Sequence, residues 1–534
     1  MYRRRTLAAL LLSAATIGLG IGVGTVSAAP TSPQERVDAA YKAMGLTNGV
    51  NTLVVKGGMH TWDPGESQDA YKPETGDFGV STFTESADLG RGLYRVDWVR
   101  PKPNGGMRNY TEVFSNEIGG KMGGYVTGVD INNGTPARAV GPADKPLHTM
   151  SGVRLTAELR ELERNNVVSE MHANPGRVSD YPAQTVDGKS YPAVEYRGNY
   201  GIFIVLFDPA TGLPAVVRTR DFDVIEGDSN YDQTLSDWRE AGRGVKVPFH
   251  QVITINGLKI FDTTLTEVSV NSALPADAFA IPAELRGKAA APAPVENVRW
   301  QWVLRRMGNG FYLDTDAYYT ADGGSLKIQD IAPNISFVNG GSHNTLIVAT
   351  NDGLIAVEAP GDDGQSKIVM GLAEQKYPGK PWKYLLLDHH HIDHIGGLRA
   401  FAAVGATIVV GKGDGAFYRK VLSAPETLNP YGTKQVPPKV EEVDGKWSAT
   451  EGGRTIEAYS LDNPHSTGYI IPYIPDAKLG FVTDIWSPAP QIPPANPGTT
   501  ALVKGVQKMG IQMDRMAGGH GGVGNFADLA KTVQ

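Results

Sequence analysis

The first half of the chain consists of short runs in which apolar and polar residues alternate, as in strands with one buried face. Such runs occupy residues 52–55, 93–99, 110–114, 191–196, 200–207, 213–219, 251–255 and 258–261. The last two flank Asn256-Gly257, a dipeptide that favours a two-residue hairpin turn. Helical patterns are expected only at residues 32–44 and 154–165. The pattern predicts a long antiparallel meander that forms a curved sheet rather than a sandwich, with one or two helices.

The second half has a different pattern, in which strand-like and helix-like segments alternate. Strands are expected at residues 335–339, 344–349, 354–357, 384–387, 406–410, 468–474 and 479–482. Helices are expected at residues 366–377, 398–404, 499–509 and 526–533, with sizeable loops at 411–447 and 487–498. This alternation is typical of an α/β domain. An Ala/Pro-rich linker, residues 286–296, has no hydrophobic period and separates the two halves.

The beginning of the chain has the features of an export signal. Arg3-Arg4-Arg5 precede an apolar Gly/Ala-rich segment, and Val26-Ser27-Ala28 fits a small-x-small cleavage site. We therefore divide the chain into a signal peptide (1–28), a β-rich domain (29–285), the linker (286–296) and an α/β domain (297–534). The mature protein is expected to be periplasmic or secreted.

Composition narrows the possible partners. Removal of residues 1–28 takes away three Arg and no acidic residue, which leaves 47 basic against 57 acidic residues and a net charge of −10. No Lys/Arg-rich block remains, so a nucleic-acid partner is not expected. No later segment is apolar for long enough to predict a membrane span. The chain has no Cys, so its stability must come from packing. The sequence does not indicate an oligomeric state.

Residues 388–394, Asp-His-His-His-Ile-Asp-His, carry the clearest chemical signal. They follow the apolar run 384–387 and precede Gly396-Gly397, which predicts a strand, a tight loop and the start of a helix. Three imidazoles and a carboxylate within six residues form a set that suits Zn²⁺. The alternative, a surface histidine cluster resembling a purification tag, would lack the interposed Asp and the buried strand. The pattern therefore predicts a metal site.

Further candidate ligands follow downstream, each in a loop or at the end of a strand: His465, Asp484 and His520. With these motifs in order, residues 325–534 resemble the metallo-β-lactamase-fold hydrolase superfamily. The resemblance implies an αββα sandwich and two Zn²⁺ ions per chain. It assigns His389, His391 and His465 to the first ion, and Asp393, His394 and His520 to the second, with Asp484 bridging both. It also implies that Asp393 is catalytic and orients or deprotonates the nucleophile.

Several residues depart from the usual pattern of this superfamily. Asp388 stands where Thr is usual, and Glu358 stands where the first strand usually ends in Asp. Either could orient a ligand histidine through its other ring nitrogen. We expect His390 and His343 to be structural or supporting. His390, Tyr418 and Tyr469 are unranked candidates for an acid that protonates the leaving group.

The resemblance implies a hydrolase that uses a metal-bridging hydroxide on an ester, thioester, lactone or amide. Asp484 and the lack of Cys are similar to the thioesterase, lactonase and phosphodiesterase branches, so a β-lactam is a less favoured substrate. The first alternative is hydrolysis of a phosphoric or sulfuric ester.

A non-enzymatic alternative is a periplasmic carrier whose metal site is vestigial. The β-rich half resembles the half-barrel of periplasmic lipoprotein-carrier proteins at residues 92–97 and 268–271, which implies a small, apolar substrate or ligand. Because every candidate ligand follows residue 388, a chain that begins near Asn297 is expected to fold, bind metal and cleave small activated esters.

Overall fold

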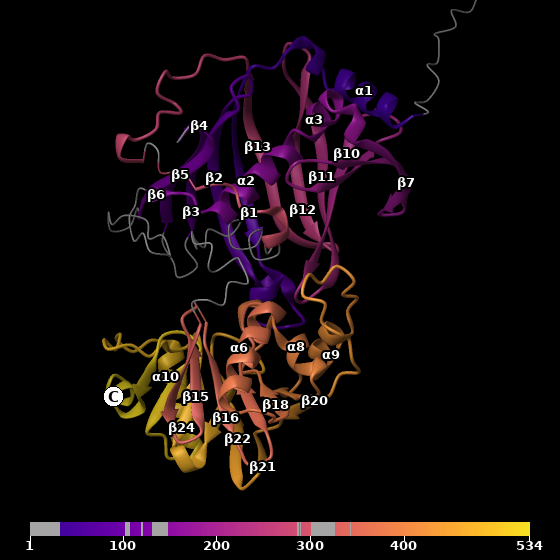
Figure 1. Ribbon diagram of the computed structural model, residues 1–534. Helices are drawn as coiled ribbons and strands as arrows, with labels where there is room; N and C mark the ends of the chain where they lie inside the picture. Colours follow the sequence, from indigo (N-terminus) through magenta and orange to yellow (C-terminus); the bar gives the residue numbers. More distant parts are fainter. Residues whose placement is uncertain are drawn as a thin grey trace, which may run out of the picture.

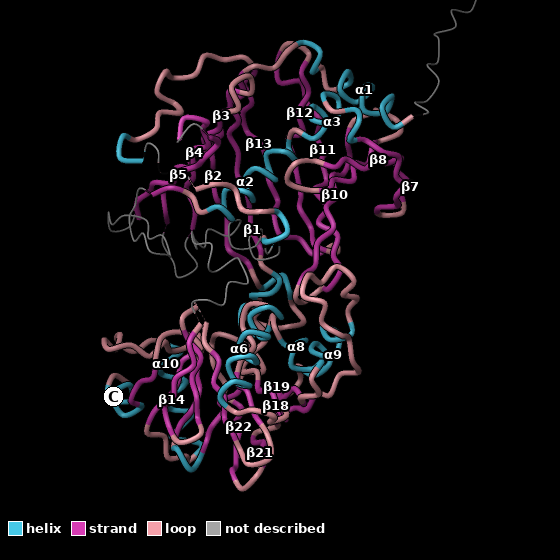
Figure 2. The backbone as a smooth tube through the Cα atoms, in the orientation of Figure 1, coloured by secondary structure: helices cyan, strands magenta, loops and turns pink. Residues whose placement is uncertain are grey.

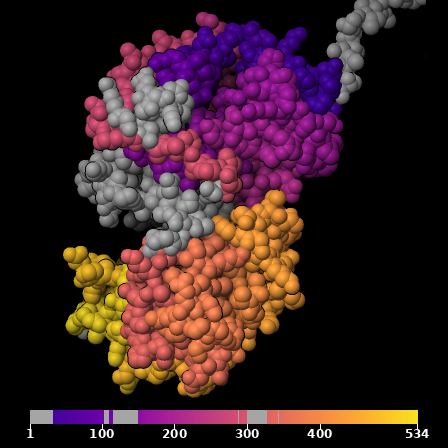
Figure 3. Space-filling view, in the orientation of Figure 1, coloured from indigo at the N-terminus to yellow at the C-terminus, as the bar shows by residue number. Residues whose placement is uncertain are grey.

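The computed structural model describes residues 32–101, 107–118, 121–130, 148–285, 288, 290–298, 300, 326–341 and 343–533. The proposed signal peptide and part of the linker lie outside these residues. The described residues form two lobes, an N-terminal lobe and a C-terminal lobe (Figures 1 and 3). Among the described helices, none combines the length and apolar character that a membrane crossing needs.

The N-terminal lobe is built on one 13-stranded sheet in the order β6-β5-β4-β3-β2-β1-β13-β12-β11-β10-β9-β8-β7. The pairs are antiparallel throughout, so the expected meander is confirmed. The hairpin at Asn256-Gly257 is confirmed too, because both residues have the positive φ that this turn needs. The strands are β1 (Thr52–Trp62), β2 (Asp77–Asp88), β3 (Leu93–Pro101), β4 (Met107–Ile118), β5 (Lys121–Asp130), β6 (His148–Thr149), β7 (Val178–Val186), β8 (Lys189–Arg197), β9 (Ile202–Phe207), β10 (Pro214–Asp223), β11 (Gly227–Gly242), β12 (Val245–Ile255) and β13 (Leu258–Val270).

Within the described part of the chain, three helices accompany this sheet: α1 (Pro33–Ala43), α2 (Gly152–Asn165) and α3 (Val167–Ala173). Ser32 begins α1 with a capping box to Glu35, which explains why the sequence signal for this helix was clear. The short α3 was not predicted. It buries Val167, Val168 and Met171 against the sheet, so tertiary packing stabilises a segment with little helical signal of its own.

The C-terminal lobe contains a seven-stranded sheet, β14 to β20 in chain order, and a six-stranded sheet, β21 to β26. Their facing sides share one core, in which Ile355 and Val357 of one sheet meet Ile456 and Phe481 of the other. Helices cover the outer faces, which gives the expected αββα layers (Figure 2). The strands are β14 (Lys327–Ala332), β15 (Ile335–Asn339), β16 (Thr345–Ala349), β17 (Leu354–Val357), β18 (Trp382–Leu386), β19 (Thr407–Gly411), β20 (Val440–Val443), β21 (Lys446–Glu451), β22 (Arg454–Ser460), β23 (Ile470–Ile474), β24 (Leu479–Val482), β25 (Arg515–Gly518) and β26 (Val523–Asn525).

The helices of this lobe are α6 (Asp363–Lys376), α7 (Ile392–Ile395), α8 (Leu398–Ala403), α9 (Gly415–Ser423), α10 (Pro497–Met509) and α11 (Phe526–Lys531). The expectation of a loop over residues 411–447 was wrong. This segment contains α9 and β20, because Tyr418, Val421 and Leu422 are buried in the core and β20 extends the parallel part of the first sheet.

The two lobes share a hydrophobic core. Phe222, Val224 and Ile225 of the N-terminal lobe pack in one cluster with Leu398 and Phe401 of the C-terminal lobe. Buried Arg399 crosses the same boundary and donates hydrogen bonds to the carbonyl oxygens of Val224 and Val421. The lobes are therefore packed together through buried side chains.

Candidate metal centre

The histidine motif lies at the carboxyl end of β18, which pairs in parallel with β17 and β19. In parallel sheets this edge commonly forms the binding site. The strand ends at Leu386, and Asp388 to His391 form the following turn rather than a continuation of the strand. The short α7 then brings Asp393 and His394 back toward the same point. Every residue from Asp388 to His394 is buried.

One group of possible ligand atoms comes from His389, His391, His465 and Asp484. All four atoms lie within 4.8 Å of one another. Nε2 of His465 lies 3.2 Å from Nε2 of His389 and 3.0 Å from Oδ2 of Asp484. Three imidazoles and one carboxylate in this arrangement match the ligand number and type of a zinc-class ion.

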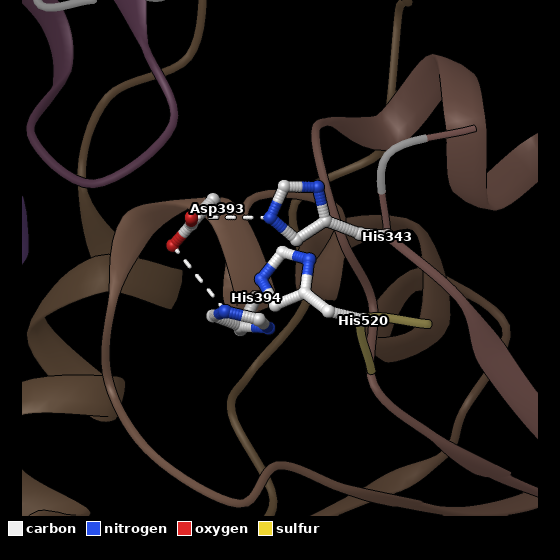
Figure 4. Close-up of side chains that lie close together, drawn as sticks. All are labelled: His343, Asp393, His394 and His520. Atoms are coloured by element: carbon white, nitrogen blue, oxygen red, sulfur yellow. Dashed lines mark hydrogen bonds and ion pairs between the residues drawn. The ribbon is translucent and has the colours of Figure 1, made fainter. Parts of the chain in front are cut away.

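A second group comes from His343, Asp393, His394 and His520 (Figure 4). Nε2 of His343 lies 3.1 Å from Oδ2 of Asp393, and Nε2 of His394 lies 3.6 Å from Oδ1 of the same residue. The structure therefore brings all seven residues singled out from the sequence into two adjacent groups and adds His343.

Asp484 lies between the two groups. Its Oδ1 lies 2.9 Å from Nε2 of His520, while its Oδ2 lies 3.0 Å from Nε2 of His394 and 3.2 Å from Nε2 of His389. Asp484 has φ +59°, and Glu358, which also supports the site, has φ +72°. Side chains other than glycine rarely adopt this left-handed backbone, and such strain concentrates at functional sites. The strained backbone at Asp484 fits a carboxylate that serves two metal positions.

Two buried carboxylates orient the imidazoles, as the sequence suggested. Nδ1 of His389 donates to Oδ1 of Asp388 at 2.9 Å, and Nδ1 of His394 donates to Oε2 of Glu358 at 2.7 Å. A neutral imidazole that carries its proton on Nδ1 presents a lone pair on Nε2. In both residues Nε2 is the atom that faces Asp484.

His391 is oriented the opposite way. Its Nε2 donates to the carbonyl oxygen of Ser67 at 2.9 Å, so Nδ1 keeps the lone pair. Among the described residues, no hydrogen-bond partner meets the buried Nδ1 of His391. A buried polar atom is rarely left in this state unless something else binds it. The donor set and this atom fit a pair of zinc-class ions.

The electrostatics of the site favour bound cations. Burial together with the neighbouring His389 and His465 keeps the pKa of His391 well below its usual value, so this imidazole stays neutral. Burial alone would lower the pKa of His389, but Asp388 and the hydrogen bond to Asp484 raise it to about 10. Burial would also raise the pKa of Asp484, but the charge of His394 and hydrogen bonds from the histidines hold it well below its usual value. An ionised carboxylate and proton-binding imidazoles are groups that a metal ion can hold in place of protons.

His343 was not among the ligands predicted from the sequence. The structure brings it to the site because Asn344 binds the loop that carries His520. The Asn344 side chain donates to the carbonyl oxygens of Gly518 and Gly521, each at 2.9 Å. Burial and the nearby His520 lower the pKa of His343 to about 3, so its imidazole is neutral and able to bind a cation. A histidine just before β16 is the only sequence signal that could have indicated this role.

Two of the three candidate acids, His390 and Tyr469, make hydrogen bonds within the protein. Both nitrogens of His390 are engaged, with the Ser67 carbonyl at 2.8 Å and the Ser466 hydroxyl at 3.2 Å. The Tyr469 hydroxyl donates to the carbonyl oxygen of Thr483 and accepts from its N–H. Tyr418 is fully buried. His390 therefore supports the site, as expected from the sequence.

Residues 338–518 match the sequence profile of the metallo-beta-lactamase superfamily. A solved structure similar to this chain is a stereoselective inverting sec-alkylsulfatase from Pseudomonas sp., with 15% identity and a TM-score of 0.31 over 41% of this chain. The chain covers 43% of that enzyme, less than half of its length. Another is a metallo-beta-lactamase from Pontibacter korlensis, with 18% identity and a TM-score of 0.31 over 39% of this chain and 97% of that one. No curated protein sequence matches the chain.

Proposed function

We propose that this protein, whose residues 338–518 match the metallo-beta-lactamase superfamily, is a metal-dependent hydrolase that binds two zinc ions and cleaves an ester, thioester, lactone or amide. The observation that carries this proposal is the position of Asp484, whose carboxylate faces both groups of ligand atoms: Oδ1 faces His520, and Oδ2 faces His389, His394 and His465. A shared carboxylate is how a protein holds two cations close together despite their repulsion.

The ligand groups have distinct tasks in this proposal. His389, His391 and His465 would hold one ion, and Asp393, His394 and His520 the other, with His343 as an additional neighbour. When bound, such ions lower the pKa of water towards neutrality and polarise the substrate oxygen. Asp388 and Glu358 keep the lone pairs of His389 and His394 directed into the site. The Asp393 carboxylate, which lies 3.6 Å from Nε2 of His394, would orient the attacking water or accept its proton.

The alternatives differ in what they require of the site. A β-lactam substrate is less favoured, because Asp484 and the absence of Cys are similar to the thioesterase, lactonase and phosphodiesterase branches that the family resemblance implies. Cleavage of phosphoric or sulfuric esters uses the same ligand set and stays the second candidate. A carrier with a vestigial site would have no need of two complete ligand groups or of the buried carboxylates behind them.

Metal analysis combined with a substrate panel tests the proposed function. Protein purified without chelator and supplemented with Zn²⁺ is expected to hold about two ions per chain. It should hydrolyse a chromogenic ester, thioester or lactone faster than a phosphodiester, a sulfate ester or a β-lactam, and chelator should remove the activity. Metal content near zero after supplementation would contradict the proposal, and a preference for the phosphodiester or the sulfate ester would favour the second candidate.

We also propose that the protein is exported to the periplasm or beyond, on the evidence of its first 28 residues. The full-length chain expressed in a Gram-negative host is expected in the periplasmic fraction, with a new N-terminus at Ala29. Mass spectrometry of the recovered protein measures this directly. An intact Met1 on protein confined to the cytoplasm would contradict export.

A further inference from the structure

The loop between β1 and β2, residues 63–76, extends from the N-terminal lobe to the metal centre. It leaves the sheet at the end of β1 that lies nearest the C-terminal lobe (Figure 1). Two short 3-10 turns, Pro64–Glu66 and Pro73–Thr75, give it a compact shape. The Asp63 N–H donates to the carbonyl oxygen of Gly76 at 2.8 Å and closes the base of the loop. The loop is thus a built element with a defined conformation.

The carbonyl oxygen of Ser67 is the central contact of this loop. It accepts hydrogen bonds from Nε2 of His390 at 2.8 Å and from Nε2 of His391 at 2.9 Å. Ser67 is buried, so this oxygen acts away from solvent. Its bond to His391 fixes which ring nitrogen carries the proton and leaves Nδ1 for the metal. One lobe therefore sets the orientation of a metal ligand in the other.

Further hydrogen bonds hold the loop against two segments that border the site. The carbonyl oxygen of Gln68 accepts from the N–H of Thr467 at 2.9 Å, two residues after His465. The Tyr71 hydroxyl donates to the carbonyl oxygen of Gly413 at 2.8 Å and accepts from the N–H of Phe417 at 3.0 Å. These hydrogen bonds attach the loop to the segment after His465 and to the segment that begins α9. The loop therefore forms one wall of the site.

Glu66 brings a carboxylate to this wall. Its Oε2 lies 3.8 Å from Nδ1 of His391, the nitrogen that faces the first group of ligand atoms. Its side chain is only 12% exposed, so solvent screens its charge weakly. A fixed negative charge beside the reaction centre repels an anionic group on a substrate and tolerates a neutral one.

We propose that residues 63–76 form part of the active site, and that Glu66 selects neutral over anionic substrates. This inference rests on the proposed hydrolase function and narrows its substrate class. Sulfate and phosphate esters carry a negative charge on the group that is attacked, so Glu66 would repel them. Uncharged carboxylic esters, thioesters, lactones and amides would be preferred.

The test compares Glu66→Gln with the wild-type protein on p-nitrophenyl butyrate and p-nitrophenyl hemisuccinate, a neutral and an anionic ester with the same leaving group. The ratio of kcat/KM for the anionic ester to that for the neutral ester should rise on the order of tenfold in the variant, as expected for removal of one nearby charge. Calorimetry should show that inorganic phosphate binds the zinc-loaded variant more tightly by a similar factor. Glu74→Gln, which removes the charge of an exposed residue of the same loop, should change neither quantity.

The outcomes separate this inference from the proposed function. An unchanged substrate ratio and unchanged phosphate affinity in Glu66→Gln would overturn the inference while the hydrolase proposal stands. Loss of a zinc ion from Glu66→Gln would also overturn it, because Glu66 would then be a ligand. If the wild-type protein binds zinc but cleaves neither ester, the proposed function fails, and the phosphate measurement still decides whether Glu66 repels anions.

Discussion

Asp484→Asn is expected to lower turnover by at least about a thousandfold and to reduce the bound zinc to one ion per chain or less. The variant keeps the shape of the side chain but replaces one carboxylate oxygen with an amide that donates hydrogen bonds. At present both oxygens face imidazole nitrogens, with Oδ1 toward His520 and Oδ2 toward His389, His394 and His465. An amide nitrogen in either position cannot bind a cation, and loss of the negative charge leaves two ions to repel each other.

Steady-state kinetics and elemental analysis of the same preparation measure this effect. Asp476→Asn is the matched control, because Asp476 is a half-exposed carboxylate that pairs with Arg454 at the turn before β24. It should keep full activity and two ions. If Asp484→Asn retained both turnover and zinc stoichiometry, Asp484 would not be a bridge and the β-lactamase-like reading would gain support.

Separation of the two lobes is expected to have the second large effect. The sequence suggested that a chain beginning near Asn297 would be active by itself, but the structure gives a reason to expect the opposite. Such a chain would expose Leu398 and Phe401, which now pack against Phe222 and Val224, and would leave buried Arg399 without its acceptor at Val224. It would also remove the Ser67 carbonyl that orients His391. We expect activity on a small ester to fall by about a hundredfold or more, with weaker zinc binding.

The experiment compares three samples: the mature chain, residues 297–534, and residues 297–534 mixed with residues 29–296. Activity on p-nitrophenyl acetate, zinc affinity and the thermal unfolding curve are measured for each. Recovery of activity in the mixture would show that the contacts between the lobes, rather than the peptide link, are what the site needs. Full activity of residues 297–534 alone would refute this expectation and return the N-terminal lobe to an accessory role.

The histidine motif could be read from the sequence because its ligands are local. His389, His391, Asp393 and His394 lie within six residues, and one turn followed by the short helix α7 is sufficient to bring them together. Asp388 and Glu358 were identified as supporting residues because they stand where the superfamily usually has Thr and Asp. His465, Asp484 and His520 were candidates because each lies in a loop or at the end of a strand, but only the family resemblance assigned them to the two ions.

The sequence by itself determined those features that depend on interactions between residues close together in the chain. Alternation of apolar residues distinguished the antiparallel sheet from the α/β domain, and turn and capping residues such as Asn256-Gly257 and Ser32 located individual hairpins and helices. The tertiary structure alone decided the place of His343, which depends on the Asn344 contacts to the glycine loop more than 170 residues later. It also decided that residues 63–76 border the metal centre, because Ser67 and His391 are 324 residues apart and meet through a backbone carbonyl. Every residue has a backbone carbonyl, so no sequence pattern identifies the carbonyl that orients a metal ligand. The packing of the two lobes around a shared core brings the Ser67 carbonyl to His391.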